Sequence, residues 1–129
     1  MSYVAPEDAS NKLIESLEEI KARNGEQAWR ECVLATGRFR MLVLCWPPGH
    51  GHPKHYHPRT DEIWYICEGK LKVIFDDREP MVAGSRSLLF VGKRTTHDML
   101  SVGEKPLEML VFVAPNGPDD EVSLFTPTK

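Results

Sequence analysis

The pattern of hydrophobic and polar residues changes its period near residue 29. Before that point, from Glu7 to Arg23, apolar residues recur at helical spacing and charged residues occupy most of the other positions. This pattern predicts one amphipathic helix. We expect Ser10 to cap it or Asp8 to lie in its first turn, and Asn24-Gly25 to end it. The apolar stripe of the predicted helix consists of Leu13, Ile14, Leu17 and Ile20.

From Trp29 onward, short apolar runs with a period of two are separated by turn residues. Since no helices separate these runs, the strands must pair antiparallel, and strands this short are expected to close into a barrel or a two-sheet roll. The chain is therefore predicted to be all-β apart from its N-terminal helix. The nine predicted strands are 29–34, 38–46, 54–58, 62–68, 70–75, 79–82, 86–91, 96–102 and 107–114.

A chain of 129 residues has the length of one domain and can bury a core without disulfides. We divide it into an N-terminal arm and helix (1–28), a β-barrel (29–115) and a C-terminal surface tail (116–129). In the strand at 38–46 both alternating sets of side chains are apolar. This strand is expected to be buried on both sides, and either set can face the interior.

The net charge of the chain is −3, with 16 basic and 19 acidic residues dispersed along it. There is no basic stripe for phosphates, so nucleic acid is not an expected partner. The longest apolar run is far shorter than the roughly 20 residues that span a bilayer, so we expect a cytoplasmic protein without membrane contact. Three widely spaced cysteines, Cys32, Cys45 and Cys67, do not suggest a disulfide framework and are expected to be reduced core thiols.

Candidate chemistry concentrates between Gly49 and Gly69, a stretch that holds four of the five histidines. His55 and His57 are separated by one residue, so on a strand they project to the same side and can share a metal ion. A short turn follows. Either Asp61 or Glu62 could return a carboxylate to the same ion across that turn.

The same stretch resembles the first motif of the cupin superfamily, in which Gly, five residues, His-x-His, three or four residues, Glu, six residues and Gly follow one another. All of its anchors are present: Gly49, His55, His57, Glu62 and Gly69. Gly84 and His97 resemble the ends of the second cupin motif. Between them Gly92 is retained, Phe90 replaces the proline of the motif, and two additional residues precede the histidine.

The resemblance covers about residues 38–114 and implies a small antiparallel β-barrel of the jelly-roll type. It also implies that one divalent metal ion lies inside the barrel, and that members of the family often dimerise through N-terminal strands. We therefore expect a homodimer that uses the strand at 29–34 and the helix. The ligands that the resemblance implies are His55, His57, Glu62 and His97.

Further residues are expected to line a pocket beside these ligands. Trp64 and Met99 share strand faces with them. His50 and His52 precede the motif in a Gly- and Pro-rich loop and are expected at the mouth of the pocket.

Among the basic residues, Arg38 and Arg40 alternate with apolar residues and are expected to face outward. Arg86 and the pair at 93–94 lie near the second motif and are better placed to meet an anionic substrate. No general base can be assigned from the sequence.

Three imidazoles and one carboxylate suit Fe, Mn, Ni, Co or Zn as the divalent ion and leave positions open for a substrate. Two kinds of enzyme acting on a small molecule follow: an oxygenase, or a Lewis-acid isomerase or lyase. A non-catalytic cupin that binds or senses a small ligand is the alternative from another class.

Overall fold

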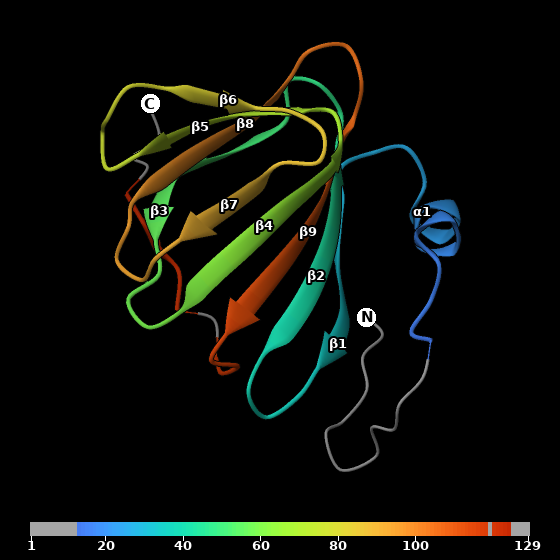
Figure 1. Ribbon diagram of the computed structural model, residues 1–129, viewed down its shortest axis with the longest axis horizontal. Coiled ribbons are helices and arrows are strands. Elements are labelled where there is room, and N and C mark those ends of the chain that lie inside the picture. The colour runs from blue at the N-terminus through green and yellow to red at the C-terminus, as the bar shows by residue number, and fades with distance from the viewer. Residues whose placement is uncertain (1–12, 119, 125–129) are drawn as a thin grey trace, which may run out of the picture.

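Two antiparallel sheets that face each other make up most of the computed structural model, which describes residues 13–118 and 120–124 (Figure 1). In spatial order, the first sheet contains β1 (Trp29–Ala35), β2 (Arg40–Trp46), β9 (Leu107–Ala114), β4 (Asp61–Glu68) and β7 (Leu88–Val91). The second contains β10 (Val122–Ser123), β3 (Gly51–Tyr56), β8 (His97–Val102), β5 (Lys70–Phe75) and β6 (Met81–Ala83). The predicted all-β, antiparallel fold is confirmed.

The main core lies between the two sheets. Trp64 and Ile66 of β4 and Leu71 and Val73 of β5 are buried there, at positions that alternate with more exposed ones. Burying an aliphatic or aromatic side chain of this size contributes about 1.5–3 kcal/mol. The period-two pattern of the sequence therefore sets which face of each strand points inward.

Strand β2 is covered on both faces, and the two coverings show which of its two alternating sets of apolar side chains faces the interior. Leu44 belongs to the core between the sheets, whereas Val43 packs with Ile20 of α1 (Leu17–Asn24) and Val33 of β1. Figure 1 shows α1 on the side of β1 and β2 that faces away from the second sheet. The residues of β2 with even numbers thus face the interior.

The helix is shorter than predicted. It begins at Leu17 because Ser16 has an extended backbone and its hydroxyl accepts a hydrogen bond from the Glu19 amide at 3.2 Å. Leu13 and Ile14, which we placed on the helical stripe, are exposed and not helical. The Ser-x-x-Glu spacing of a capping box was the signal for this start.

The predicted end of the helix is confirmed at Asn24. Gly25 follows with φ +79°, and its amide donates to the Lys21 carbonyl at 3.1 Å. The candidate caps Asp8 and Ser10 lie outside the described residues. Within those residues, no helix has the length and apolar character needed to cross a bilayer.

Two strand predictions need correction. Strand β3 begins at Gly51, three residues earlier than predicted, because Gly51 and His52 pair with β8. His52 therefore lies on a strand and not in the loop. Inside the predicted surface tail, Val122 and Ser123 form β10 and pair with β3.

The three cysteines are free thiols, as predicted. Cys32 and Cys45 are buried, and Cys67 is half-buried. Burial raises the pKa of the Cys45 and Cys67 thiols, which keeps both protonated near neutral pH.

Gly69 joins β4 to β5 at a point of close backbone approach. Its φ is +91°, and a Cβ added there would lie 2.5 Å from the Pro106 carbonyl oxygen. Gly84, by contrast, has open space around the same position. An added methyl group would therefore clash with the backbone at Gly69 but not at Gly84.

We expect Gly69→Ala to lower the free energy of unfolding by about 3 kcal/mol or more, because left-handed strain and a backbone clash add together. The matched change Gly84→Ala should alter it by less than about 0.5 kcal/mol. Urea unfolding followed by tryptophan fluorescence measures both. Equal losses in the two variants would contradict the packing described for Gly69.

Candidate metal centre

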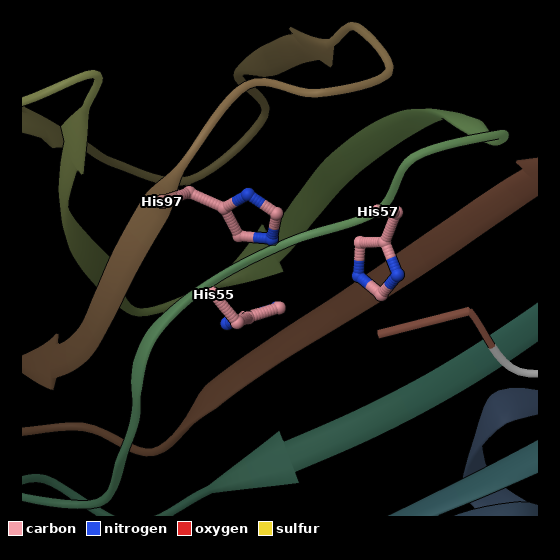
Figure 2. A group of neighbouring side chains, drawn as sticks. All are labelled: His55, His57 and His97. Carbon is pink, nitrogen blue, oxygen red and sulfur yellow. The ribbon is translucent and has the colours of Figure 1, made fainter. Parts of the chain in front are cut away.

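Three histidines converge between the sheets. His55 lies on β3, His57 directly follows that strand, and His97 begins β8, where it pairs with His55. One ring nitrogen of each lies within 4.8 Å of the others. Figure 2 shows the three imidazoles around a common space. The predicted His-x-His pair thus shares one side of the chain, and pairing of β3 with β8 adds the third imidazole.

Backbone carbonyls orient two of these rings. The Nδ1 atom of His55 donates to the Pro53 carbonyl at 2.8 Å, and that of His97 donates to the Thr95 carbonyl at 3.0 Å. A neutral imidazole with its proton on Nδ1 presents a lone pair on Nε2. Both rings therefore present Nε2 as the atom that could hold a metal ion.

His57 is oriented by a carboxylate from the far end of the chain. Its Nδ1 lies 3.1 Å from Asp120 Oδ1, and the Arg59 amide donates to Asp120 Oδ2 at 2.8 Å. Burial by itself would raise the pKa of Asp120, but these hydrogen bonds outweigh it and hold that pKa below its usual value. Sequence reasoning placed Asp120 in a surface tail and missed this role.

Glu62 lies beside the three imidazoles. It is buried, its Oε1 accepts a hydrogen bond from Trp64 Nε1 at 2.7 Å, and its Oε2 lies 3.3 Å from His57 Nε2. With Nδ1 of His57 directed at Asp120, two lone pairs face each other across that 3.3 Å unless a proton or a cation lies between them. Asp61, the alternative carboxylate, is exposed and accepts from the Lys93 amide.

Burial keeps two of the imidazoles uncharged. It lowers the pKa of His97 to about 4, with the nearby His55 adding repulsion, and it also lowers the pKa of His55. Metal binding needs neutral imidazole. Both rings are consequently in the ligand form at neutral pH.

A cavity of about 390 Å³ opens from the histidines along the inner face of the first sheet. Trp64, Met99 and His52 line it. His50, which we expected at the mouth, is not among the lining residues. It is exposed, and its ring lies 5.1 Å from that of Trp46.

The cavity also has lining residues that sequence reasoning missed. Arg40 was expected to face outward, yet it lines the cavity with Arg30 and Glu121. The residues proposed to meet an anionic substrate, Arg86 and the pair at 93–94, do not line it. The signal for Arg40 was its even position on β2, which it shares with the inward-facing leucines of that strand.

Glu121 connects the C-terminal segment to the histidines. Its Oε2 lies 3.1 Å from His52 Nε2, and its Oε1 lies 4.0 Å from His55 Nε2. One atom from each of these three residues also lies within 4.8 Å of the others. A carboxylate and an imidazole therefore stand directly beside the three-histidine group.

Residues 42–113, more than half of the chain, match the family model of the cupin domain. The chain belongs to the cupin family. This confirms the resemblance seen in the sequence, and the two facing antiparallel sheets are the jelly roll that it implied.

Curated proteins are similar to parts of this cupin. It is 31% identical over 85 residues to polyketide synthase CurC of Streptomyces cyaneus, a match that covers 65% of this chain and 53% of that protein. This cupin spans about half the length, or less, of the curated relatives it matches. Their activities therefore do not transfer directly.

Solved structures share the fold at low identity. An uncharacterised protein with a double-stranded β-helix domain from Klebsiella pneumoniae matches with a TM-score of 0.73 and 20% identity, covering 87% of this cupin and 96% of that chain. The DMSP lyase DddQ from Ruegeria pomeroyi matches with a TM-score of 0.68 and 18% identity, covering 84% and 57%. Both matches establish the jelly-roll fold.

The low pKa of His97 predicts acid sensitivity of the metal-free protein. Between pH 6.5 and about 4 the unfolded chain holds a proton on this residue that the folded protein does not, so the free energy of unfolding falls as pH is lowered. We expect a loss of about 3 kcal/mol across this range. Urea unfolding of chelator-treated protein at several pH values measures it.

Substitution of His97 isolates the contribution of its ring to the pH dependence of the free energy of unfolding. His97→Gln should show a shallower pH dependence than the wild type, whereas His50→Gln, at an exposed ring, should retain the wild-type slope. An unchanged slope in His97→Gln would show that another group causes the acid sensitivity.

Proposed function

We propose that this cupin binds one divalent metal ion through His55, His57, His97 and Glu62 and uses it as a Lewis acid on a small molecule. The observation that carries the proposal is the convergence of three imidazole nitrogens within 4.8 Å. The hydrogen bonds at Nδ1 support it, since they direct Nε2 toward the common space.

The donor set fits such an ion. Three nitrogens and a carboxylate oxygen suit Fe, Mn, Ni, Co or Zn, all of which accept imidazole. The 3.3 Å approach of Glu62 Oε2 to His57 Nε2 is a place where a cation would relieve the contact of two lone pairs. Glu62, hydrogen-bonded by Trp64, would be the carboxylate ligand.

When bound, the ion would polarise a carbonyl or hydroxyl oxygen of the substrate. The protein itself supplies a group that can accept or return a proton beside that oxygen. His52 and Glu121 lie 3.1 Å apart and both line the cavity. Met99 and Leu42 add apolar surface to the cavity lining beside these groups.

The pair formed by His52 and Glu121 favours a reaction that transfers a proton over one that uses molecular oxygen. An isomerase or lyase must move a proton at a carbon next to the polarised oxygen, and such a step needs an acid–base group at the ion. The DMSP lyase that shares the fold is an enzyme of this broad class, although fold alone assigns no reaction. We therefore place the isomerase or lyase reading ahead of an oxygenase and of a non-catalytic binding protein.

The reduced thiols suit a reducing compartment. Cys32, Cys45 and Cys67 are unpaired, and free cysteines persist where glutathione and thioredoxin keep them reduced. We propose the cytoplasm as the site of action.

The metal proposal predicts stoichiometric binding that depends on the histidines. Wild-type protein should bind about one divalent ion per chain, and the double variant His55→Ala/His57→Ala should lose that ion while keeping its fold, because the core is apolar. His50→Ala is the matched control. Elemental analysis and calorimetric titration measure binding, and circular dichroism checks the fold.

The identity of the bound metal and the uptake of oxygen by the wild-type protein distinguish a Lewis-acid enzyme from an oxygenase. Bound zinc, manganese or nickel without oxygen uptake supports the Lewis-acid reading. Bound iron with substrate-dependent oxygen uptake would favour an oxygenase instead. Unchanged metal content in the double histidine variant would refute the site.

We also propose that two copies associate through the outer face of the first sheet. Paired residues form one apolar row across four strands there: Phe90 of β7, Ile63 of β4, Phe112 of β9 and Met41 of β2. Phe90 and Ile63 are 67% and 45% exposed. A flat apolar row can pack against its own copy about a twofold axis, the commonest symmetry of oligomers.

This interface differs from the one expected from the sequence. Helix α1 packs Ile20 against its own sheet, so its apolar face is already used within the chain. Met41, at one end of the row, packs against the same cluster as Ile20, whereas Ile63 and Phe90 are exposed among residues 13–118 and 120–124. We therefore place the homodimer contact on the sheet and not on the helix.

The double variant Ile63→Arg/Phe90→Arg should be a monomer, because four like charges would meet at the twofold axis. Val82→Arg, on an exposed residue of the second sheet, should leave the mass unchanged. Size-exclusion chromatography with light scattering gives both masses. A dimer that persists in the double variant would exclude this interface.

A further inference from the structure

We infer that Arg40 recognises a carboxylate, or a similar anionic oxygen group, on the molecule that this cupin binds. The inference rests on the proposed function in one respect, since it takes the cavity beside the histidines as the binding site. It adds the chemical class of the ligand and the residue that selects it.

The register of the first sheet places Arg40 in line with the metal centre. Glu62 of β4 pairs with Val113 of β9, and Val113 pairs in turn with Arg40 of β2. Arg40 and Glu62 thus occupy one row across the inner face, two strand spacings apart, which is about 10 Å between Cα atoms. A small molecule held at one end beside Glu62 can reach the guanidinium with its other end.

Neutral acceptors hold the guanidinium in place. Arg40 Nη1 donates to Asn116 Oδ1 at 3.3 Å and to the Gly117 carbonyl at 3.2 Å. Asn116 is fixed in turn, because its Nδ2 donates to the Thr36 carbonyl at 2.7 Å. The C-terminal turn at 116–117 therefore fixes the position of Arg40 through acceptors that carry no formal charge.

The charge of Arg40 has no carboxylate counterpart among residues 13–118 and 120–124, where no ion pair to it is found. This contrasts with Arg23, which forms ion pairs with Glu15 and Glu31. Apart from the turn at 116–117, the cavity lining next to Arg40 is apolar and consists of Ala35, Leu42 and Val113. In such surroundings a guanidinium binds a carboxylate through two parallel hydrogen bonds, more strongly than it would in water.

Arg30 is the competing candidate within the same cavity. It lies on β1 and pairs with Leu44, whereas Arg40 lies on β2 and pairs with Ala35, so the two arginines lie at opposite ends of the β1–β2 pair. Arg30 is also more exposed than Arg40, and at an exposed position an ion pair contributes little. Arg40 is half-buried and lies in the row of Glu62, which favours it as the recognition residue.

The test uses hydroxy acids of two, three and four carbons as probes, each compared with its neutral amide. Binding is followed through the indole N–H signal of Trp64 in ¹⁵N-labelled full-length protein, because this residue lines the cavity. In metal-free protein we expect at least one acid to bind about tenfold or more tightly than its amide. Arg40→Gln should abolish that preference while leaving affinity for the amide unchanged.

Matched variants distinguish recognition from general charge. Arg38→Gln removes one charge at an exposed position that does not line the cavity, and it should keep the preference. Arg40→Lys should retain part of it. The inference is overturned if Arg40→Gln keeps the preference, if it weakens acid and amide equally, or if Arg30→Gln carries the whole effect.

A parallel titration with zinc separates this inference from the metal proposal. If zinc does not bind but Arg40→Gln removes the acid preference in metal-free protein, the metal proposal fails and the role of Arg40 stands. If zinc binds with unchanged affinity in Arg40→Gln and the acid preference persists, the role of Arg40 fails alone.

Discussion

Placement of three imidazoles between two apolar sheets, two of them buried and His57 half-buried, is the constraint on which the site depends. A polar ring in such a place must have its N–H satisfied, or it costs the free energy of an unmade hydrogen bond. His55 and His97 donate to carbonyls within their own strands or loops, and His57 donates to Asp120. Each hydrogen bond also fixes the rotation of its ring, so that what satisfies the buried donor also directs the opposite nitrogen inward.

The C-terminal segment has a larger part in this arrangement than its length suggests. Asp120 orients His57, Glu121 reaches His52, and the turn at Asn116 holds Arg40. Strand β10 attaches the segment to β3, next to the histidines. The two sheets therefore supply the frame, while the C-terminal segment contributes Asn116 and Glu121 to the cavity lining and Asp120 to the orientation of His57.

Local periodicity could predict those parts of the site that lie on one strand. His55 and His57 project to one side, and Glu62 and Trp64 share a face, because side chains alternate along a strand. Asp120 could not be predicted in this way, since it meets His57 from 63 positions away through a segment without a repeating pattern. His97 was identified through the family resemblance and not through its spacing.

The side to which Arg40 points depended on an element outside the sheet. Both sets of alternating residues in β2 are apolar, and the sequence alone allowed either to face inward. Packing of α1 on Val43 decides the matter, because it assigns the odd-numbered residues to the outer face. The correct orientation of a cavity residue thus followed from the docking of a helix on the opposite face of its strand.

The bulge in β1 sets the shape of the cavity where it meets Arg40. The register of β1 and β2 shifts between Cys32 and Leu34, and as a result Ala35 lines the cavity while Leu34 does not. A gain or loss of one residue in an edge strand is thus a route by which a small methyl group and a bulky isobutyl group exchange places beside the arginine. Such a change would alter the space beside Arg40 without moving His55, His57, His97 or Glu62, none of which lies on β1.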